Sequence, residues 1–163
     1  MSGVYESDRK PSPCDHMALA RSIRIEMTAL MASEKVVPKK HRLLLSVPTI
    51  ATARELVNNV ETAEAFYPST AHGVLWRKHY LTLAIANCYQ LTQGLQVVKD
   101  LGLPVNLNRY EKIAGMLGKE LDTLTSRKRN TKLTGSAGID ERIAKLRYDL
   151  AELEEIASDL PVP

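Results

Sequence analysis

The residues of this chain with the greatest chemical reactivity are its four histidines and two cysteines, and their spacing matches no active site. They are His16, His41, His72, His79, Cys14 and Cys88. No His-Glu-x-x-His sequence is present, and no helical Glu-x-x-His pair of the kind that builds a di-iron centre. Phosphate-binding glycine loops and the Gly-x-Ser-x-Gly turn of hydrolases are also missing. These patterns favour a binding protein with no catalytic residues, metal or cofactor.

Positive charge is more conspicuous, because it gathers in three short clusters. The clusters are Lys39, Lys40, His41 and Arg42, then Arg77, Lys78 and His79, and finally Arg127, Lys128, Arg129 and Lys132. Each could be a solvated corner between helices or a surface that contacts phosphates. The second cluster places cations in the first turns of a predicted helix, where they oppose the helix macrodipole. We therefore take the clustered lysines and arginines as candidates for binding nucleic acid or a protein partner.

The formal net charge of +3 conceals a basic body and an acidic tail. Residues 1–132 contain 19 basic and 12 acidic residues, whereas residues 133–163 contain 3 basic and 7 acidic ones. The first residues lack the apolar segment of an export signal, and Cys14 and Cys88 lack the spacing of a metal site. We expect reduced thiols and a cytoplasmic protein.

Apolar spacing predicts an all-α chain, because no convincing strand pattern is present. The predicted parts are a flexible arm at 1–14, helices at about 15–33, 46–66, 74–102 and 108–132, a linker at 133–138 and an amphipathic helix at 139–160. Four helices with short connections predict an antiparallel up-down four-helix bundle over residues 15–132. In that topology the second and third clusters share one end, and the first cluster lies with Lys99 at the opposite end.

Local signals place the ends of these helices. Asp15 is a candidate N-cap of the first helix, Ser69 and Thr70 are candidate N-caps of the third, and Asn108 with Glu111 resembles a capping box. Gly102 followed by Pro104 is typical of a helix C-terminus. In the fourth helix, Gly115 and Gly118 weaken the backbone but would allow a neighbouring helix to approach closely. Its predicted apolar stripe is Tyr110, Ile113, Leu117, Leu121 and Leu124.

The third predicted helix is unusual because residues 80–98 contain no Asp, Glu, Lys or Arg. Two adjacent apolar stripes would cover more than half of its circumference, namely Leu81, Ile85, Cys88, Thr92 and Leu95, and Trp76, Tyr80, Leu83, Ala84, Leu91, Val98 and Leu101. Its Asn, Gln and Thr residues argue against a membrane span. A core helix of a monomer and an oligomer interface both fit, and the loss of charge with retained Tyr and Gln favours the interface.

The C-terminal helix carries an unbroken heptad seam. Its members are Ile139, Ile143, Leu146, Leu150, Leu153, Ala157 and Leu160. The helix could dock on the bundle or pair with another chain, and Pro161 ends it.

Several segments together resemble the accessory variability determinant protein of diversity-generating retroelements. These segments are Val37-Pro38-Lys39-Lys40-His41-Arg42, the break Phe66-Tyr67-Pro68, the long uncharged helix, Asp100-Leu101-Gly102-Leu103-Pro104, and Tyr110 to Leu121 with the basic end after it. That protein is in turn similar to the four-helix-bundle family encoded by intervening sequences of ribosomal RNA genes. The resemblance covers roughly residues 15 to 132, and the acidic tail departs from it.

The resemblance implies a non-enzymatic accessory protein that forms a basic homopentamer, binds a reverse transcriptase and engages its template RNA during mutagenic cDNA synthesis. DNA is a second candidate partner. Lys39, Lys40, Arg42, Arg77 and Lys78 would be the first candidates for these contacts. The family's basic C-terminal end is matched by Arg127, Lys128 and Arg129. A helical protein-interaction scaffold without a nucleic-acid role is the main alternative, and an enzyme with a site inside the bundle is the other.

Overall fold

The computed structural model describes residues 15–134 and 139–159. Its elements are α1 (Asp15–Ala32), α2 (Lys39–His41), a π-helical turn η2 (Arg42–Ser46), α3 (Val47–Ala65), α4 (Ala71–Asp100), α5 (Leu107–Asn130) and α6 (Ile139–Asp159). No strand occurs in these two ranges, which confirms the predicted all-α class. The predicted arm at 1–14, most of the predicted linker and Leu160 lie outside the described residues.

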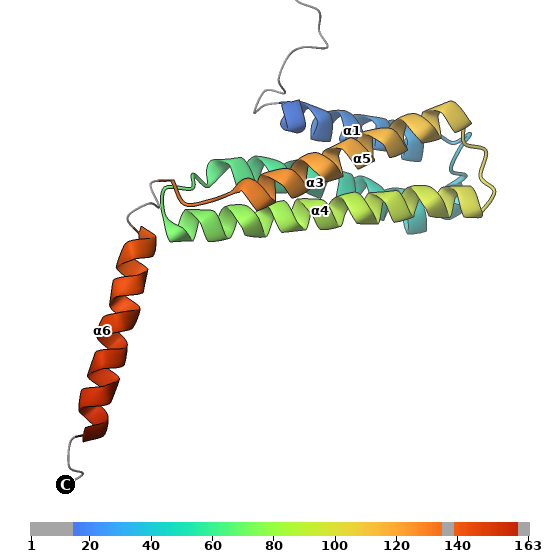
Figure 1. Cartoon of the computed structure of the whole chain (residues 1–163). Helices are drawn as coiled ribbons and strands as arrows, with labels where there is room; N and C mark the ends of the chain where they lie inside the picture. Colours follow the sequence, from blue (N-terminus) through green and yellow to red (C-terminus); the bar gives the residue numbers. More distant parts are fainter. Residues whose placement is uncertain (1–14, 135–138, 160–163) are drawn as a thin grey trace, which may run out of the picture.

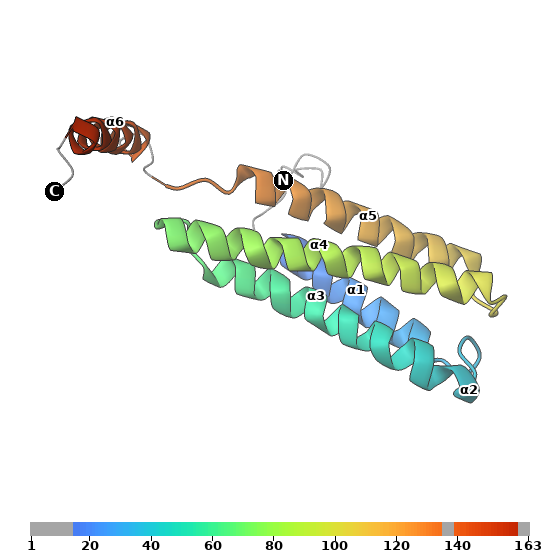
Figure 2. The same ribbon diagram turned by 90° about the horizontal axis from the view of Figure 1, so that it is seen from below.

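Four long helices pack side by side around one apolar core (Figures 1 and 2). Helix α3 contacts α4 and α1, and helix α5 contacts the same two helices. The largest fully buried apolar side chains come from all four: Ile23, Met27, Leu30, Met31, Leu56, Leu81, Leu91, Leu95, Ile113, Leu117 and Leu124. Helix α6 leads away from them in both views, beyond the end where α5 finishes.

The helical path that contains α3 begins earlier than predicted. Helix α3 itself begins at Val47 with Ser46 as its N-cap residue, as predicted, but the chain already turns into helix at Lys39 and continues through η2 into α3. Pro38 precedes this start, and no Gly or Pro interrupts residues 39–47. The Ser46 hydroxyl donates to the carbonyl of Met31 at 2.7 Å, so this predicted helix start is a buried contact with α1. The first basic cluster therefore lies in the opening turns of a helix.

Side-chain and glycine caps delimit α4 as the sequence predicts. Thr70 accepts a hydrogen bond from the backbone N–H of Gly73 at 3.0 Å, which satisfies one of the free donors of the first turn. Gly102 adopts φ +63°, a left-handed conformation that suits glycine. The Gly102 N–H bonds the carbonyl of Lys99 at 2.9 Å, and Leu103 N–H bonds that of Val98 at 3.2 Å. These two bonds form a Schellman motif.

The start of α5 differs from the prediction. The N-cap is Asn106, whose side chain accepts from the backbone N–H of Arg109 at 3.2 Å, and Asn108 already lies within the helix. A cap two residues earlier is possible because Asn106 follows Pro104 and Val105 in an extended segment. Gly115 and Gly118 do not provide a close approach, since a Cβ at either position would meet no atom within 4 Å.

One face of α4 is buried, and its remaining circumference is open. Leu81, Leu91 and Leu95 enter the core, whereas Leu83 and Leu101 of the second predicted stripe are exposed. The two predicted apolar stripes are therefore covered only in part within the single chain, where α4 packs mainly against α3 and α5. Its open face between residues 80 and 98 carries no charge.

Candidate functional site

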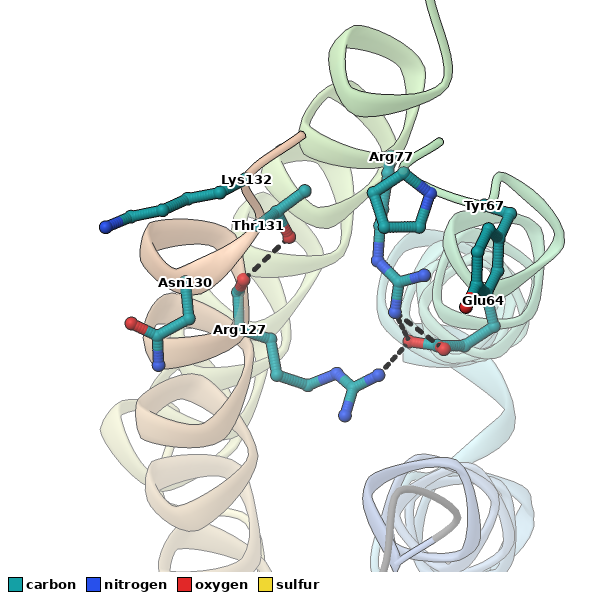
Figure 3. Close-up of a pocket in the computed structure, with 8 residues that line it drawn as sticks. Glu64, Tyr67, Arg77, Arg127, Asn130, Thr131 and Lys132 are labelled. Carbon is teal, nitrogen blue, oxygen red and sulfur yellow. Dashed lines mark hydrogen bonds and ion pairs between the residues drawn. The ribbon is translucent and has the colours of Figure 1, made fainter. Parts of the chain in front are cut away.

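One glutamate organises the end of the packed helices at which α3 finishes and α4 begins. Glu64 of α3 lies between Arg77 of α4 and Arg127 of α5 (Figure 3). Arg77 Nη2 donates to the two carboxylate oxygens at 2.8 and 2.7 Å, and Arg127 Nη2 donates to Oε1. Arg77 Nη1 also donates to the backbone carbonyl of Phe66 at 3.3 Å. The expected meeting of Arg77 and Arg127 at one end of the fold is thus confirmed.

These two arginines keep the carboxyl group of Glu64 ionised. Partial burial raises the pKa of its carboxyl group, but the hydrogen bond and charge of Arg127, together with Arg77, outweigh burial and leave the pKa below its usual value. The three side chains are partly buried, so removing one partner would leave charge in a poorly solvated position. Arg77 and Arg127 therefore connect three helices, a structural role that sequence patterns did not predict.

A pocket of about 640 Å³ opens beside this ion-pair network. It is lined by Glu64, Tyr67, Pro68, Arg77, Arg127, Asn130, Thr131 and Lys132. Thr131 Oγ1 donates to the carbonyl of Arg127 at 2.8 Å, while Lys132 extends away from Glu64 (Figure 3). The lining contains three cationic side chains and one carboxylate, so an anionic group such as a phosphate would be attracted to it.

The other candidates at this end have no ion pair with any described residue. Lys78 of α4 and Lys128 of α5 are partly exposed, and Arg129 is exposed. None of these three makes a salt bridge or side-chain hydrogen bond within the described ranges. Their charges are consequently not neutralised by the described part of the fold, unlike those of Arg77 and Arg127.

The first basic cluster likewise contains one arginine with partners in the chain and two lysines without an ion pair to a described residue. Arg42 Nη2 bonds the carbonyl of Ala32 at 3.3 Å, at the C-terminus of α1, and lies 3.3 Å from a carboxylate oxygen of Glu34. Lys39 and Lys40 are exposed in α2, with no ion pair to a described residue. Arg42 therefore binds the C-terminal end of α1, and the two exposed lysines are the cations of this cluster without an ion pair to a described residue.

Lys99, which was expected beside the first cluster, interacts with an aromatic ring. Its Nζ lies 5.5 Å from the centroid of Tyr110, within the range of a cation–π contact. The Tyr110 hydroxyl donates to Gln96 at 2.9 Å, and Gln96 donates to Asp100 at 2.7 Å. This chain of contacts links the end of α4 to the start of α5.

Two buried polar groups were missed by sequence reasoning. Asn59 of α3 donates to Asn87 of α4 at 2.8 Å, and Asn87 is almost completely buried. Glu120 of α5 is fully buried, and neither of its carboxyl oxygens has a hydrogen-bond partner among the described residues. Burial raises the pKa of Glu120 to about 8, although Arg127 lowers it in part. The spacing to Leu117 and Leu124 could have revealed Glu120, because it completes an i, i+3, i+7 stripe with them.

Comparison with known proteins found no matching family, no matching curated protein and no matching solved structure. Within residues 15–134 and 139–159, none of the helices combines the length and apolarity needed to cross a membrane. In the same ranges, no group of three or more His, Cys, Asp or Glu side chains is arranged to hold a metal ion. Cys88 is buried as a free thiol, and burial raises its pKa to about 12.

Proposed function

We propose that this chain is a non-enzymatic accessory protein that binds RNA or DNA through phosphates and presents it to a reverse transcriptase of a diversity-generating retroelement. The single observation that carries the binding function is that five cations of the predicted clusters make no ion pair with a described residue: Lys39, Lys40, Lys78, Lys128 and Arg129. Cations that are not neutralised internally can release counterions from a polyanion. The polymerase and the template RNA rest on the family resemblance alone.

The four long helices are, in this proposal, an antiparallel up-down four-helix bundle. Each contacts two of the others, and the connections between successive helices are short, which is the pattern of such bundles. In the bundle these five clustered cations lie toward its two ends. Arg77 and Arg127 then fix the geometry at one end, and Lys78, Lys128 and Arg129 contact phosphates.

We also propose that the protein is a homo-oligomer, with a pentamer as the expected form. The support is the open face of α4, which carries Leu83, Tyr89 and Val97 and no charged residue between positions 80 and 98. Tyr89 alone is 56% exposed. Aromatic and aliphatic side chains without charge are typical of the centre of a protein interface. Native mass spectrometry with and without RNA measures the assembly directly.

The salt dependence of RNA binding tests the phosphate contacts. The double variant Lys78→Gln with Lys128→Gln removes two proposed phosphate contacts. For single-stranded RNA, the slope of the log binding constant against log salt concentration should become less steep by about 1.4. Fluorescence anisotropy of a labelled single strand at a series of salt concentrations gives this slope. Both residues lack described ion pairs, so the variant should keep its far-UV circular dichroism.

A second pair on α5 serves as the matched control. Lys112→Gln with Lys119→Gln removes the same amount of charge, but Lys112 is already paired with Glu26 at 2.6 Å and Lys119 lies in the middle of the helix. The control should change the slope much less. Equal effects of the two pairs, or no salt dependence in the parent protein, would refute the proposed binding surface.

A protein-interaction scaffold is the second candidate function, and α6 favours it. Leu146, Leu150 and Leu153 are exposed on this helix in the single chain. Deleting residues 135–163 distinguishes the two functions. The scaffold requires α6 for partner binding, whereas the accessory protein should retain its affinity for RNA.

A further inference from the structure

A groove runs between the C-terminal part of α1 and the N-terminal part of α3, on a face that the proposed function does not use. It has a volume of about 620 Å³ and is lined by Arg21, Arg24, Ile25, Thr28, Ala29, Ala32, Ile50 and Arg54. Ile25 is 68% exposed although it lies among arginines. An exposed isoleucine with small residues beside it forms a floor that a second apolar surface could cover.

The rim of this groove is positively charged, and two of its three arginines are unpaired. Arg21 bonds Glu61 at 2.6 Å, so its charge is compensated. Arg24 and Arg54 form no ion pair or side-chain hydrogen bond with any residue in the described ranges. Both are exposed. An occupant of this groove must therefore bring apolar side chains for the floor and carboxylates for the rim.

The second half of α6 has this chemistry. Leu150 and Leu153 are 57% and 62% exposed and lie on one side of the helix. At 100° per residue, Asp149 and Glu154 flank that side to the left and right, and Glu152 points toward the opposite face. The first half of α6 has Arg142 and Arg147 in the flanking positions instead. Only the second half combines exposed apolar side chains with flanking carboxylates, as the floor and rim of the groove require.

Helix α6 leads away from the packed helices, which favours the groove of a second copy of this chain over its own as the docking site. Thr134 fixes the departure point: its N–H and hydroxyl both donate to the carbonyl of Pro68, at 2.8 and 3.0 Å. From there α6 extends beyond the end of the packed helices (Figures 1 and 2). We propose that the acidic half of α6, residues 149–154, docks in the α1–α3 groove of another copy, with Asp149 and Glu154 paired to Arg24 and Arg54.

Site-specific cross-linking of full-length chains tests this contact. One variant carries Ala29→Cys in the groove, and the other carries Leu150→Cys on α6. Both also carry Cys14→Ser, so that buried Cys88 is the only thiol besides the introduced one. The two variants are co-expressed with different tags and treated with a short bis-maleimide. A covalent heterodimer should form at least about fivefold more than homodimers of either variant, because only the mixture places the two cysteines face to face.

Each other outcome overturns the proposal. Cross-linking only when Ala29→Cys and Leu150→Cys share one chain would mean that α6 folds back on its own groove. Homodimers of Leu150→Cys alone would mean that two α6 helices pair with each other. Absence of any product, with both thiols shown to react with a small maleimide, would mean that the groove is not the docking site.

Charge reversal then tests which residues recognise each other. Arg24→Glu with Arg54→Glu should reduce the heterodimer about tenfold, and adding Asp149→Arg with Glu154→Arg to the α6 variant should restore it. Glu152→Arg is the matched control, because position 152 lies away from the seam. A loss that the α6 reversals do not rescue, or an equal loss with Glu152→Arg, would contradict the proposed pairing.

Discussion

Replacing Glu120 with glutamine should remove a loss of folding stability that the buried carboxyl group causes as pH rises. Glu120 is 0% exposed, and both of its carboxyl oxygens lack a hydrogen-bond partner among the described residues. Burial raises its pKa to about 8, and the opposing effect of Arg127 is smaller. Cys88 is the other titratable group nearby, and its thiol stays protonated because burial, with a contribution from Glu120, raises its pKa to about 12.

The sign of the effect follows from comparing the folded and unfolded chains. The unfolded carboxyl releases its proton near its ordinary pKa of 4.5, whereas the folded one keeps it until about pH 8. Between these values the unfolded state binds fewer protons, so stability falls as pH rises, by about 1.4 kcal/mol per pH unit. From pH 5 to pH 8 the loss is roughly 3 kcal/mol, and above pH 8 it levels off. Glutamine cannot ionise, so the variant lacks this loss.

Urea unfolding followed by the fluorescence of Trp76, the single tryptophan, measures the free energy of unfolding. The quantity to compare is the difference between Glu120→Gln and the parent protein at each pH, because other titrating groups cancel in it. This difference should grow in favour of the variant from pH 5 to pH 8. Glu111→Gln is the control, since Glu111 is exposed on the same helix. A difference constant to within about 0.5 kcal/mol would refute the raised pKa.

Two further predictions concern the backbone of α4 and α5. Gly73→Ala should destabilise the protein by about 1–3 kcal/mol, because a Cβ at this position would collide with the carbonyl oxygen of Tyr67. Gly115→Ala should stabilise it by about 0.5–1 kcal/mol, because a Cβ there meets open space and alanine is the better helix former. Asn106→Ala should cost about 1 kcal/mol through loss of the N-cap, and Asn108→Ala, inside the helix, should not. Thermal unfolding of the four variants checks both pairs, and either pair showing equal effects would contradict its prediction.

The ends and types of the helices were the most predictable features, because local chemistry determines them. Thr70 accepts its hydrogen bond from Gly73, only three residues away, and Gly102 closes α4 with bonds to the turn just before it. Asn106 and Asn108 show the limit of such signals. Both are good N-caps, and the choice between them depends on where the extended chain from Val105 turns into helix.

The network at Glu64 could not be predicted from sequence spacing. Arg77 and Arg127 are separated from Glu64 by 13 and 63 positions, so only the packing of α3, α4 and α5 determines which cations it meets. Glu120 differs, since its position in the stripe with Leu117 and Leu124 was visible. A glutamate is usually exposed to solvent, but the spacing of Glu120 indicates the buried face of the helix, and the structure agrees with the spacing.

At both basic ends, one or two arginines make contacts within the chain, whereas the neighbouring lysines make no described ion pair. Arg42, Arg77 and Arg127 bond backbone carbonyls or carboxylates within the chain, where a planar guanidinium can donate in several directions at once. Lys78 and Lys128 lie beside such arginines without a described ion pair. An ammonium group is strongly hydrated and flexible, which suits contacts with phosphates at no fixed geometry. Arg42, Arg77 and Arg127 thus keep the surface rigid, whereas Lys78 and Lys128 keep it charged, so substitutions in these two groups should affect different properties.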